Sequence, residues 1–173
     1  MDKIFFVRPN KELENEAIDF KNEFFKNGEY EINGSELWDK TEDYNIWYES
    51  VSKNISKKTV NPNWVVTDTF FAMRECDNKI IGIIDLRHEL NDFLKDFGHC
   101  GYSVRPSERK KGYATEMLKQ LLEIARKNEL KTIQLSCKNN NVPSIKTITK
   151  NGGVYQRSFE YDGEIADIFI IEL

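Results

Sequence analysis

A basic turn that contains a glycine lies at residues 105–114, between a strand-like stretch and an amphipathic helix, and reads Arg-Pro-Ser-Glu-Arg-Lys-Lys-Gly-Tyr-Ala. The first N–H groups of a helix have no partner within it and carry a partial positive charge, so they favour a bound anion. Gly112 lets the backbone approach such an anion without a side chain in the way. The sequence therefore predicts a phosphate site here, with a solvated basic turn that only caps a helix as the alternative.

The spacing within this turn separates it from two common phosphate-binding motifs. A Walker loop needs two glycines around four residues and then Lys-Ser/Thr, and a dinucleotide site needs Gly-x-Gly-x-x-Gly; neither pattern occurs here. The chain instead has Arg109-x-x-Gly112-x-Ala114, followed by apolar residues at helical spacing. This pattern resembles the Arg/Gln-x-x-Gly-x-Gly/Ala signature of the GNAT superfamily of N-acetyltransferases, which binds the pyrophosphate of acetyl-coenzyme A.

A second stretch of the chain carries the same resemblance. Asn141 has Ser144 three residues later and opens a helix-like segment that ends in Lys150-Asn-Gly152, which is similar to another landmark of the superfamily. One helix and one strand separate the two landmarks, as the resemblance requires. It covers the segment 65–173 well and the segment 1–60 loosely, and the stretch 81–153 resembles a bacterial subgroup of predicted acetyltransferases with no firmly assigned substrate.

The resemblance implies that acetyl-coenzyme A binds as cosubstrate along the strand before the turn, on the turn itself and at the next helix. A strand that splays from its neighbour leaves backbone N–H groups free for the thioester and the pantetheine arm, and the resemblance places this donor at Ser103 or Val104. The implied cofactor-binding residues are Tyr102, Ser103, Val104, Arg105, Arg109, Lys110, Lys111, Gly112, Tyr113, Ala114, Thr115, Asn141 and Ser144. The alternatives are a strand that simply ends at Pro106 and a helix that Asn141 caps.

The resemblance also suggests catalytic residues. His99 stands where many members have a glutamate, and an imidazole that titrates at about pH 6.5 can take a proton from an amine, directly or through water. A histidine that only hydrogen-bonds across the sheet is the alternative. The family tyrosine that protonates the leaving thiolate falls on Ile148, which cannot do so, and Tyr155 or Tyr102 could replace it.

The amine acceptor is expected where the strand at 79–87 ends and where the N-terminal segment 1–60 covers it. Arg87, His88 and Asn91 form the candidate substrate-binding group, with a surface turn as the alternative. Acidic residues scattered through the N-terminal segment suit a cationic amine or an ordinary solvated face. Two histidines without cysteine or carboxylate spacing predict no metal site.

Composition describes one globular domain. The 173 residues are 39% hydrophobic and 31% charged, with a net charge of −4, so residues 1–173 are expected to form a single domain with acceptor-side helices at 1–64 and an acetyl-coenzyme A core at 65–173. The charge argues against a nucleic-acid partner, and no apolar run of about 20 residues predicts a membrane span. Three cysteines without paired spacing indicate reduced thiols and a cytoplasmic protein. A monomer or a homodimer is expected. No base is evident beside Cys100 or Cys137, so no covalent acetyl-enzyme is expected.

The order of the predicted elements indicates a layered α+β fold. Strands are predicted at residues 4–8, 69–75, 79–87, 97–104, 132–136, 154–160 and 165–172, and helices at 11–27, 41–57, 113–128 and 142–151. The resemblance implies a mixed, mostly antiparallel central sheet of about seven strands with helices on both faces, the GNAT-like acyl-coenzyme A N-acyltransferase fold.

The function implied by these features is direct transfer of an acetyl group from acetyl-coenzyme A to a primary amine in a ternary complex. The tyrosine missing at Ile148 leaves a second interpretation open, a non-catalytic acyl-coenzyme A binding or sensing module on the same fold. A phosphate-ligand domain unrelated to coenzyme A is the third.

Overall fold

Seven strands and four α-helices make up the computed structural model, which describes residues 1–173. The strands are β1 (Ile4–Val7), β2 (Thr67–Arg74), β3 (Ile80–Arg87), β4 (Tyr102–Val104), β5 (Thr132–Lys138), β6 (Val154–Tyr161) and β7 (Glu164–Glu172). The helices are α1 (Glu14–Lys26), α2 (Tyr44–Asn54), α3 (Tyr113–Lys127) and α4 (Val142–Lys150), with short 3-10 turns η1 (Lys11–Leu13), η2 (Trp38–Lys40) and η3 (Pro106–Glu108). None of the helices is both long enough and apolar enough to cross a membrane.

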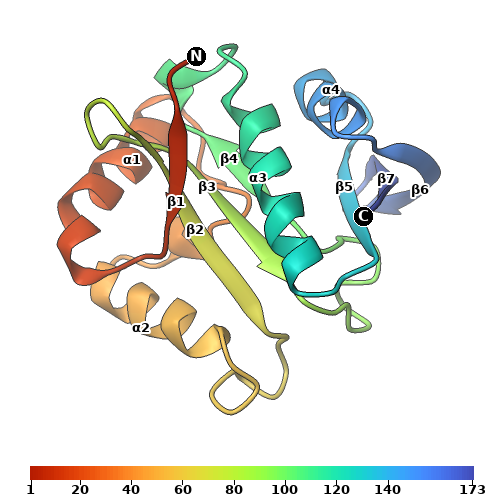
Figure 1. Ribbon diagram of the computed structural model, residues 1–173, viewed down its shortest axis with the longest axis horizontal. Helices are drawn as coiled ribbons and strands as arrows, with labels where there is room; N and C mark the ends of the chain where they lie inside the picture. The colour runs from red at the N-terminus through yellow and green to blue at the C-terminus, as the bar shows by residue number, and fades with distance from the viewer.

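The strands form two antiparallel sheets, one in the order β1-β2-β3-β4 and the other in the order β5-β7-β6. Helices α1 and α2 cover one face of the larger sheet, whereas α3 covers the other face and lies beside α4 (Figure 1). Successive residues of a strand point to opposite faces, so β3 sends Ile83 toward α1 and α2 and Ile84 toward α3. The core under α3 continues to Leu135 on β5 and Phe169 on β7, and it joins the two sheets.

The predicted α+β fold of about seven strands is confirmed, with corrections to the single mixed sheet and to the fourth strand. The seven strands are divided between two sheets, and every pairing is antiparallel. Strand β4 covers only residues 102–104 of the predicted 97–104, because Gly98 leaves the sheet to bridge Leu135 of β5. Gly98 has φ +89°, and a Cβ at this position would collide with the backbone of Gln134, so no side chain would fit there.

Local capping explains where two of the helices differ from the prediction. The Asp43 side chain accepts hydrogen bonds from the N–H groups of Asn45 and Ile46, so α2 begins after it rather than at residue 41. The first turn of the predicted helix at 11–27 is the 3-10 turn η1, which Asn10 caps. Of the stripe predicted for α3, Ala114 is only partly buried, and the other members are buried as expected, namely Met117, Leu118, Leu121, Leu122 and Ala125.

Candidate active site

The turn that precedes α3 presents a row of backbone N–H groups. Gly112 stands at the N-cap of α3 with φ +90°, and Lys110 has φ +62°. The six consecutive N–H groups from Lys110 to Thr115 donate no hydrogen bond within the chain. Left-handed residues within a turn point successive N–H groups to one side, and the helix N-terminus adds its partial positive charge. This is the geometry of an anion site.

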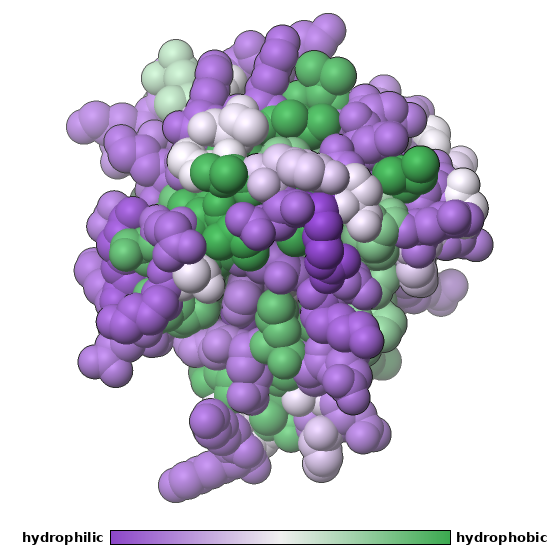
Figure 2. Space-filling view, turned by 90° about the vertical axis from the view of Figure 1, so that its right-hand side faces the viewer, coloured by the Kyte–Doolittle hydropathy of each residue, from purple (hydrophilic) through white to green (hydrophobic).

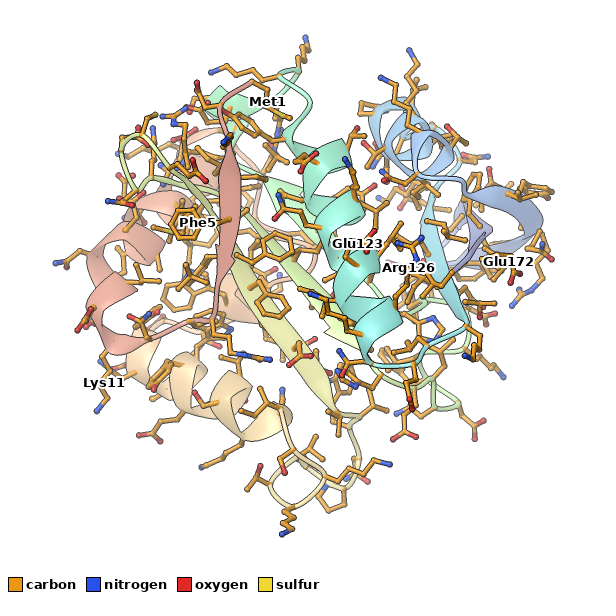
Figure 3. The ribbon with its side chains drawn as sticks, in the orientation of Figure 1. Met1, Phe5, Lys11, Glu123, Arg126 and Glu172 are labelled. Carbon is orange, nitrogen blue, oxygen red and sulfur yellow. The ribbon has the colours of Figure 1, made fainter.

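Met1, at the N-terminal end of the chain (Figure 3), lies beside Gly112. Its Sδ lies 3.4 Å from the position that a Cβ on Gly112 would occupy. Gly112 is otherwise exposed, as are Lys110 and Lys111. Lys111 pairs with Glu108 at 2.8 Å, whereas Lys110 makes no ion pair.

The side chains of the two arginines predicted at the cofactor are engaged in contacts within the chain, Arg105 in the interior and Arg109 at the surface. Arg105 is 1% exposed, and its guanidinium contacts three carboxylates of α1 as well as the Ile80 carbonyl. Arg109 donates to the Val104 carbonyl at 3.1 Å and to both carboxylate oxygens of Glu29 at 2.7 Å. The hydrogen bonds from Arg109 hold the pKa of Glu29 below its usual range. Both side chains therefore position the turn, and the N–H groups of the two residues are also engaged, with the Ile81 and Pro106 carbonyls.

Strand β4 offers two further N–H groups to the space beyond the sheet. The Asp85 N–H donates to the Gly101 carbonyl, and the Arg105 N–H donates to the Ile81 carbonyl. Hydrogen-bonded pairs fall on every second residue of an antiparallel strand, so Ser103, which lies between Gly101 and Arg105, is also paired with β3. The N–H groups of Tyr102 and Val104 consequently point to the opposite edge, where no strand pairs. Of the two expected donors, Val104 faces that edge and Ser103 does not.

The second sheet approaches β4 at one end only. Gly98 bridges Leu135, and His99 N–H donates to the Gln134 carbonyl at 2.8 Å; beyond this point no backbone hydrogen bond joins the two chain segments. The Tyr102 hydroxyl reaches Ser144 Oγ of α4 at 2.8 Å, and burial raises the pKa of Tyr102. The splayed edge predicted from the sequence therefore lies between β4 on one side and β5 with α4 on the other.

Of the residues predicted at α4, Asn141 has a capping role, whereas the Ser144 hydroxyl bonds Tyr102. The Asn141 side chain accepts from the Ser144 N–H at 3.2 Å and lies exposed at the first turn of α4. Ile148, at the position of the family tyrosine, is fully buried in the core under α3.

His99 is a hydrogen-bond acceptor through its Nδ1 atom. This atom lies 3.0 Å from the Gln134 amide, which can only donate. The ring is therefore neutral with its proton on Nε2, so its remaining nitrogen donates. Burial and the Arg87 guanidinium lower the pKa of His99, which favours the same neutral form. This arrangement corresponds to the alternative in which His99 hydrogen-bonds between the sheets.

Tyr155 lies apart from β4. It is on β6, the far strand of the smaller sheet, where its side chain is 53% exposed and its hydroxyl is 3.0 Å from Ser158 Oγ. The face formed by α4, β6 and β7 is mostly hydrophilic, with hydrophobic side chains in small groups (Figure 2). The structure gives Tyr155 no contact with the splayed edge.

The three residues predicted to bind the acceptor separate in the structure. His88 Nε2 lies 2.8 Å from Asp68, which also pairs with Arg8. The Asn91 side chain accepts from the Leu94 N–H and lines an open hollow of about 480 Å³ between residues 62–65 and 89–93. Only Arg87 points toward the segment that precedes β4, where it donates to the Gly98 carbonyl at 3.0 Å.

Two acidic residues lie beside Arg87: Asp85, which the sequence did not single out, and Glu36, which it placed only among the scattered acidic residues of the N-terminal segment. Asp85 is completely buried and accepts from Arg87 at 2.7 Å and from the Gly101 N–H. Glu36, from the segment between α1 and α2, faces Asp85 and accepts from Trp64 at 3.0 Å and from Asn54 at 3.3 Å. Burial and the nearby Asp85 carboxylate raise the pKa of Glu36 to about 8. An aspartate inside the apolar run 80–86 was the one available signal.

No group of three or more His, Cys, Asp or Glu side chains is placed to hold a metal ion. The site consists of backbone donors along β4 and the turn before α3. A buried acidic pair, Asp85 and Glu36, lies beside it on the face of β3 that α1 and α2 cover.

Comparison with known proteins connects this arrangement to one family. Several solved structures share the fold at low sequence identity. A GNAT-family acetyltransferase from Streptococcus pneumoniae has a TM-score of 0.70 and 14% identity, over 99% of this chain and 100% of that one. An acetyltransferase from Salmonella typhimurium that modifies the N-terminal serine of ribosomal protein L7/L12 has a TM-score of 0.69 and 12% identity, over 98% of this chain and 95% of that one, and yncA from Salmonella typhimurium, solved with its cofactor acetyl-CoA, has a TM-score of 0.65 and 14% identity, over 98% and 93% of the two chains. A comparison with curated protein sequences found no match. The family model described as "Acetyltransferase (GNAT) domain" matches residues 7–154. The chain is therefore an N-acetyltransferase of the GNAT family.

Proposed function

We propose that the protein transfers the acetyl group of acetyl-coenzyme A directly to a primary amine while both are bound. The observation that carries the proposal is the continuity of free donors, from Tyr102 and Val104 on β4 to the six N–H groups of residues 110–115. A thioester with a long amide-containing arm and a pyrophosphate needs donors of this kind in this order. The relative yncA, solved with acetyl-CoA, supports this choice of cosubstrate.

Different residues of this chain would bind the pyrophosphate, bind the pantetheine arm and polarise the thioester. The N–H groups of Lys110 to Thr115 bind the pyrophosphate, with Lys110 as an unpaired cation nearby. Asn141 and Ser144 lie across from β4 and hydrogen-bond the pantetheine arm, while an outward N–H of β4 polarises the thioester carbonyl. The amine nitrogen then bonds to the carbonyl carbon, the carbon–sulfur bond breaks, and the thiolate takes a proton.

The acceptor would lie on the side covered by residues 1–64, and residues 65–173 would form the acetyl-coenzyme A core of a single domain. The open hollow beside this region is lined by Trp64, Phe93, Glu89 and Asp92, and no lysine or arginine lines it. Aromatic faces and carboxylates both attract ammonium groups. This lining supports a cationic amine as the acceptor.

The proposal is tested by thiol release. Acetyl-coenzyme A is mixed with the protein and a panel of butylamine, 1,4-diaminobutane, lysine methyl ester and a short peptide with a free N-terminus. Amine-dependent release of coenzyme A with acetylated product supports the proposal. Tight binding of acetyl-coenzyme A without release for any amine would instead establish the binding or sensing module.

A further inference from the structure

Two buried side-chain polar atoms have no hydrogen-bond partner, and both adjoin Asp85. They are Thr69 Oγ1 and Arg87 Nε. Thr69 lies directly opposite Asp85 in the β2–β3 register, and Arg87 is two residues further along β3, so all three side chains lie on the same face. Thr69 is only 2% exposed. A buried hydroxyl and a guanidinium N–H that lack partners beside a carboxyl group are suited to hold an internal water.

Two carboxyl groups and only one cation lie beside these atoms. Asp85 and Glu36 face each other, and Arg87 is the one cation beside them, with its Nη2 2.7 Å from Asp85 and 3.9 Å from Glu36. The other titratable groups next to this pair are His99, which is neutral, and the buried Cys100 thiol. Two buried carboxyls that face each other cannot both ionise at low cost. The pair therefore holds one proton, which it can release and take up again near neutral pH.

The backbone at Glu36 is held in an unfavourable conformation. Glu36 and Leu37 have φ +48° and +67°, which side-chain-bearing residues rarely adopt. The Trp47 indole fixes this segment by donating to the Ser35 and Glu36 carbonyls. Strained backbone of this kind often occurs where a side chain must be aimed, and here it aims the Glu36 carboxyl at Asp85.

The pair is connected directly to the strand on which the thioester would lie. Asp85 accepts from the Gly101 N–H, one residue before Tyr102, and Arg87 holds the Gly98 carbonyl. Glu36 itself comes from the segment expected on the acceptor side. His99, the alternative proton acceptor, already uses Nδ1 to accept from Gln134.

We propose that Glu36, paired with Asp85, takes up the proton that the acceptor ammonium releases, through an internal water held by Thr69 Oγ1 and Arg87 Nε. This inference rests on the proposed function. One N–H bond of the ammonium breaks, its proton passes to the water, and a proton of the water passes to the Glu36 carboxylate. The freed amine bonds to the thioester carbon, the carbon–sulfur bond breaks, and a second amine proton goes to the thiolate. Glu36 then returns its proton to solvent.

The test compares Glu36→Gln, His99→Gln and the wild type between pH 6 and 10, with butylamine or 1,4-diaminobutane, whichever the wild type turns over faster. We expect the wild-type kcat to rise with pH and level off above about 8, the value indicated by the pKa of Glu36. Glu36→Gln should lower kcat about 10²–10⁴-fold and remove the rise. His99→Gln should keep it. Acetyl-coenzyme A affinity should stay within about twofold of wild type in both variants.

Controls separate this proposal from a structural role and from the proposed function. Glu42→Gln, an exposed carboxyl of the same segment, should leave kcat unchanged. Thr69→Val, nearly the same shape, should lower kcat about tenfold and destabilise the fold, whereas removing a hydroxyl that holds no water would stabilise it. A wild-type pH profile in Glu36→Gln, or a lost rise in His99→Gln, overturns the inference while the transferase function stands. Wild-type protein that binds acetyl-coenzyme A but acetylates no amine overturns both.

Discussion

Gly112 tests the phosphate site at the scale of one residue. We expect Gly112→Glu to weaken acetyl-coenzyme A binding at least about 100-fold, because a carboxylate would occupy the position of the pyrophosphate and repel it. Calorimetric titration measures this. Gly163→Glu is the matched control, since Gly163 also has a positive φ (+74°) and nothing within 4 Å of its Cβ position. Unchanged affinity in a folded Gly112→Glu protein would show that this turn does not bind the cofactor.

The single residue Glu36 is expected to make the stability of the folded protein depend on pH. Its folded pKa of about 8 lies above the unfolded value of 4.5, so the folded state retains a proton that the unfolded state loses. The contribution of Glu36 is therefore fully present below about pH 4.5 and is lost as pH rises through 8, at up to about 1.4 kcal/mol per pH unit. Urea unfolding between pH 5 and 8 should show a flatter profile for Glu36→Gln. A parallel profile would mean that Glu36 is ionised in the folded protein.

At the scale of elements, helix α1 supports the turn that precedes α3. Arg105 contacts Glu16, Asp19 and Glu23 of α1 at 2.7–3.0 Å, and the Ser107 N–H donates to Glu23. These contacts link the end of β4 and η3 to a helix that comes from the other end of the sequence. The position of the turn therefore depends on the packing of α1 as well as on the turn itself.

We expect Arg105→Gln to destabilise the protein by about 3 kcal/mol, because three carboxylates lose their shared cation and the Ile80 carbonyl loses its donor. The matched control is Arg126→Gln on α3, whose pair with Glu123 is exposed (Figure 3) and contributes at most about 1 kcal/mol. Chemical denaturation measures both. Equal effects of the two substitutions would show that burial adds nothing to the Arg105 cluster.

At the scale of the whole molecule, the core under α3 joins the two sheets. Ile133, Leu135 and Phe169 of the smaller sheet share this core with α3 and with β3 of the larger sheet. All three tryptophans lie within the segment 1–64, at Trp38, Trp47 and Trp64. Indole fluorescence therefore reports the segment 1–64, whereas far-ultraviolet circular dichroism reports every element.

We expect the two signals to follow a single thermal transition with one midpoint. Acetyl-coenzyme A at 100 times its dissociation constant should raise this midpoint by roughly 5–10 °C, since ligand binding of this strength adds about 2.7 kcal/mol. A fluorescence transition that precedes the dichroism transition would mean that residues 1–64 unfold on their own.

Local patterns were sufficient for much of this architecture. The apolar spacing of residues 113–128 predicted α3 and its buried stripe, and Asp162-Gly163 correctly marked the turn between β6 and β7. The unusual backbone at Gly112 also followed from the residue type. Such features depend on neighbours within a few residues, and hydrophobic periodicity and backbone preference act at that range.

The order of amino acids was enough to establish the family signature, the α+β element order and the donor-rich turn before α3. How the side chains around that turn are used was settled by the packing of the folded chain. It turned Arg105 toward α1, engaged His99 with Gln134, shortened β4 at Gly98 and brought Glu36 to Asp85. These contacts join residues far apart in the chain, and which of them meet is set by the packing of whole helices and sheets, which no local pattern of residues encodes.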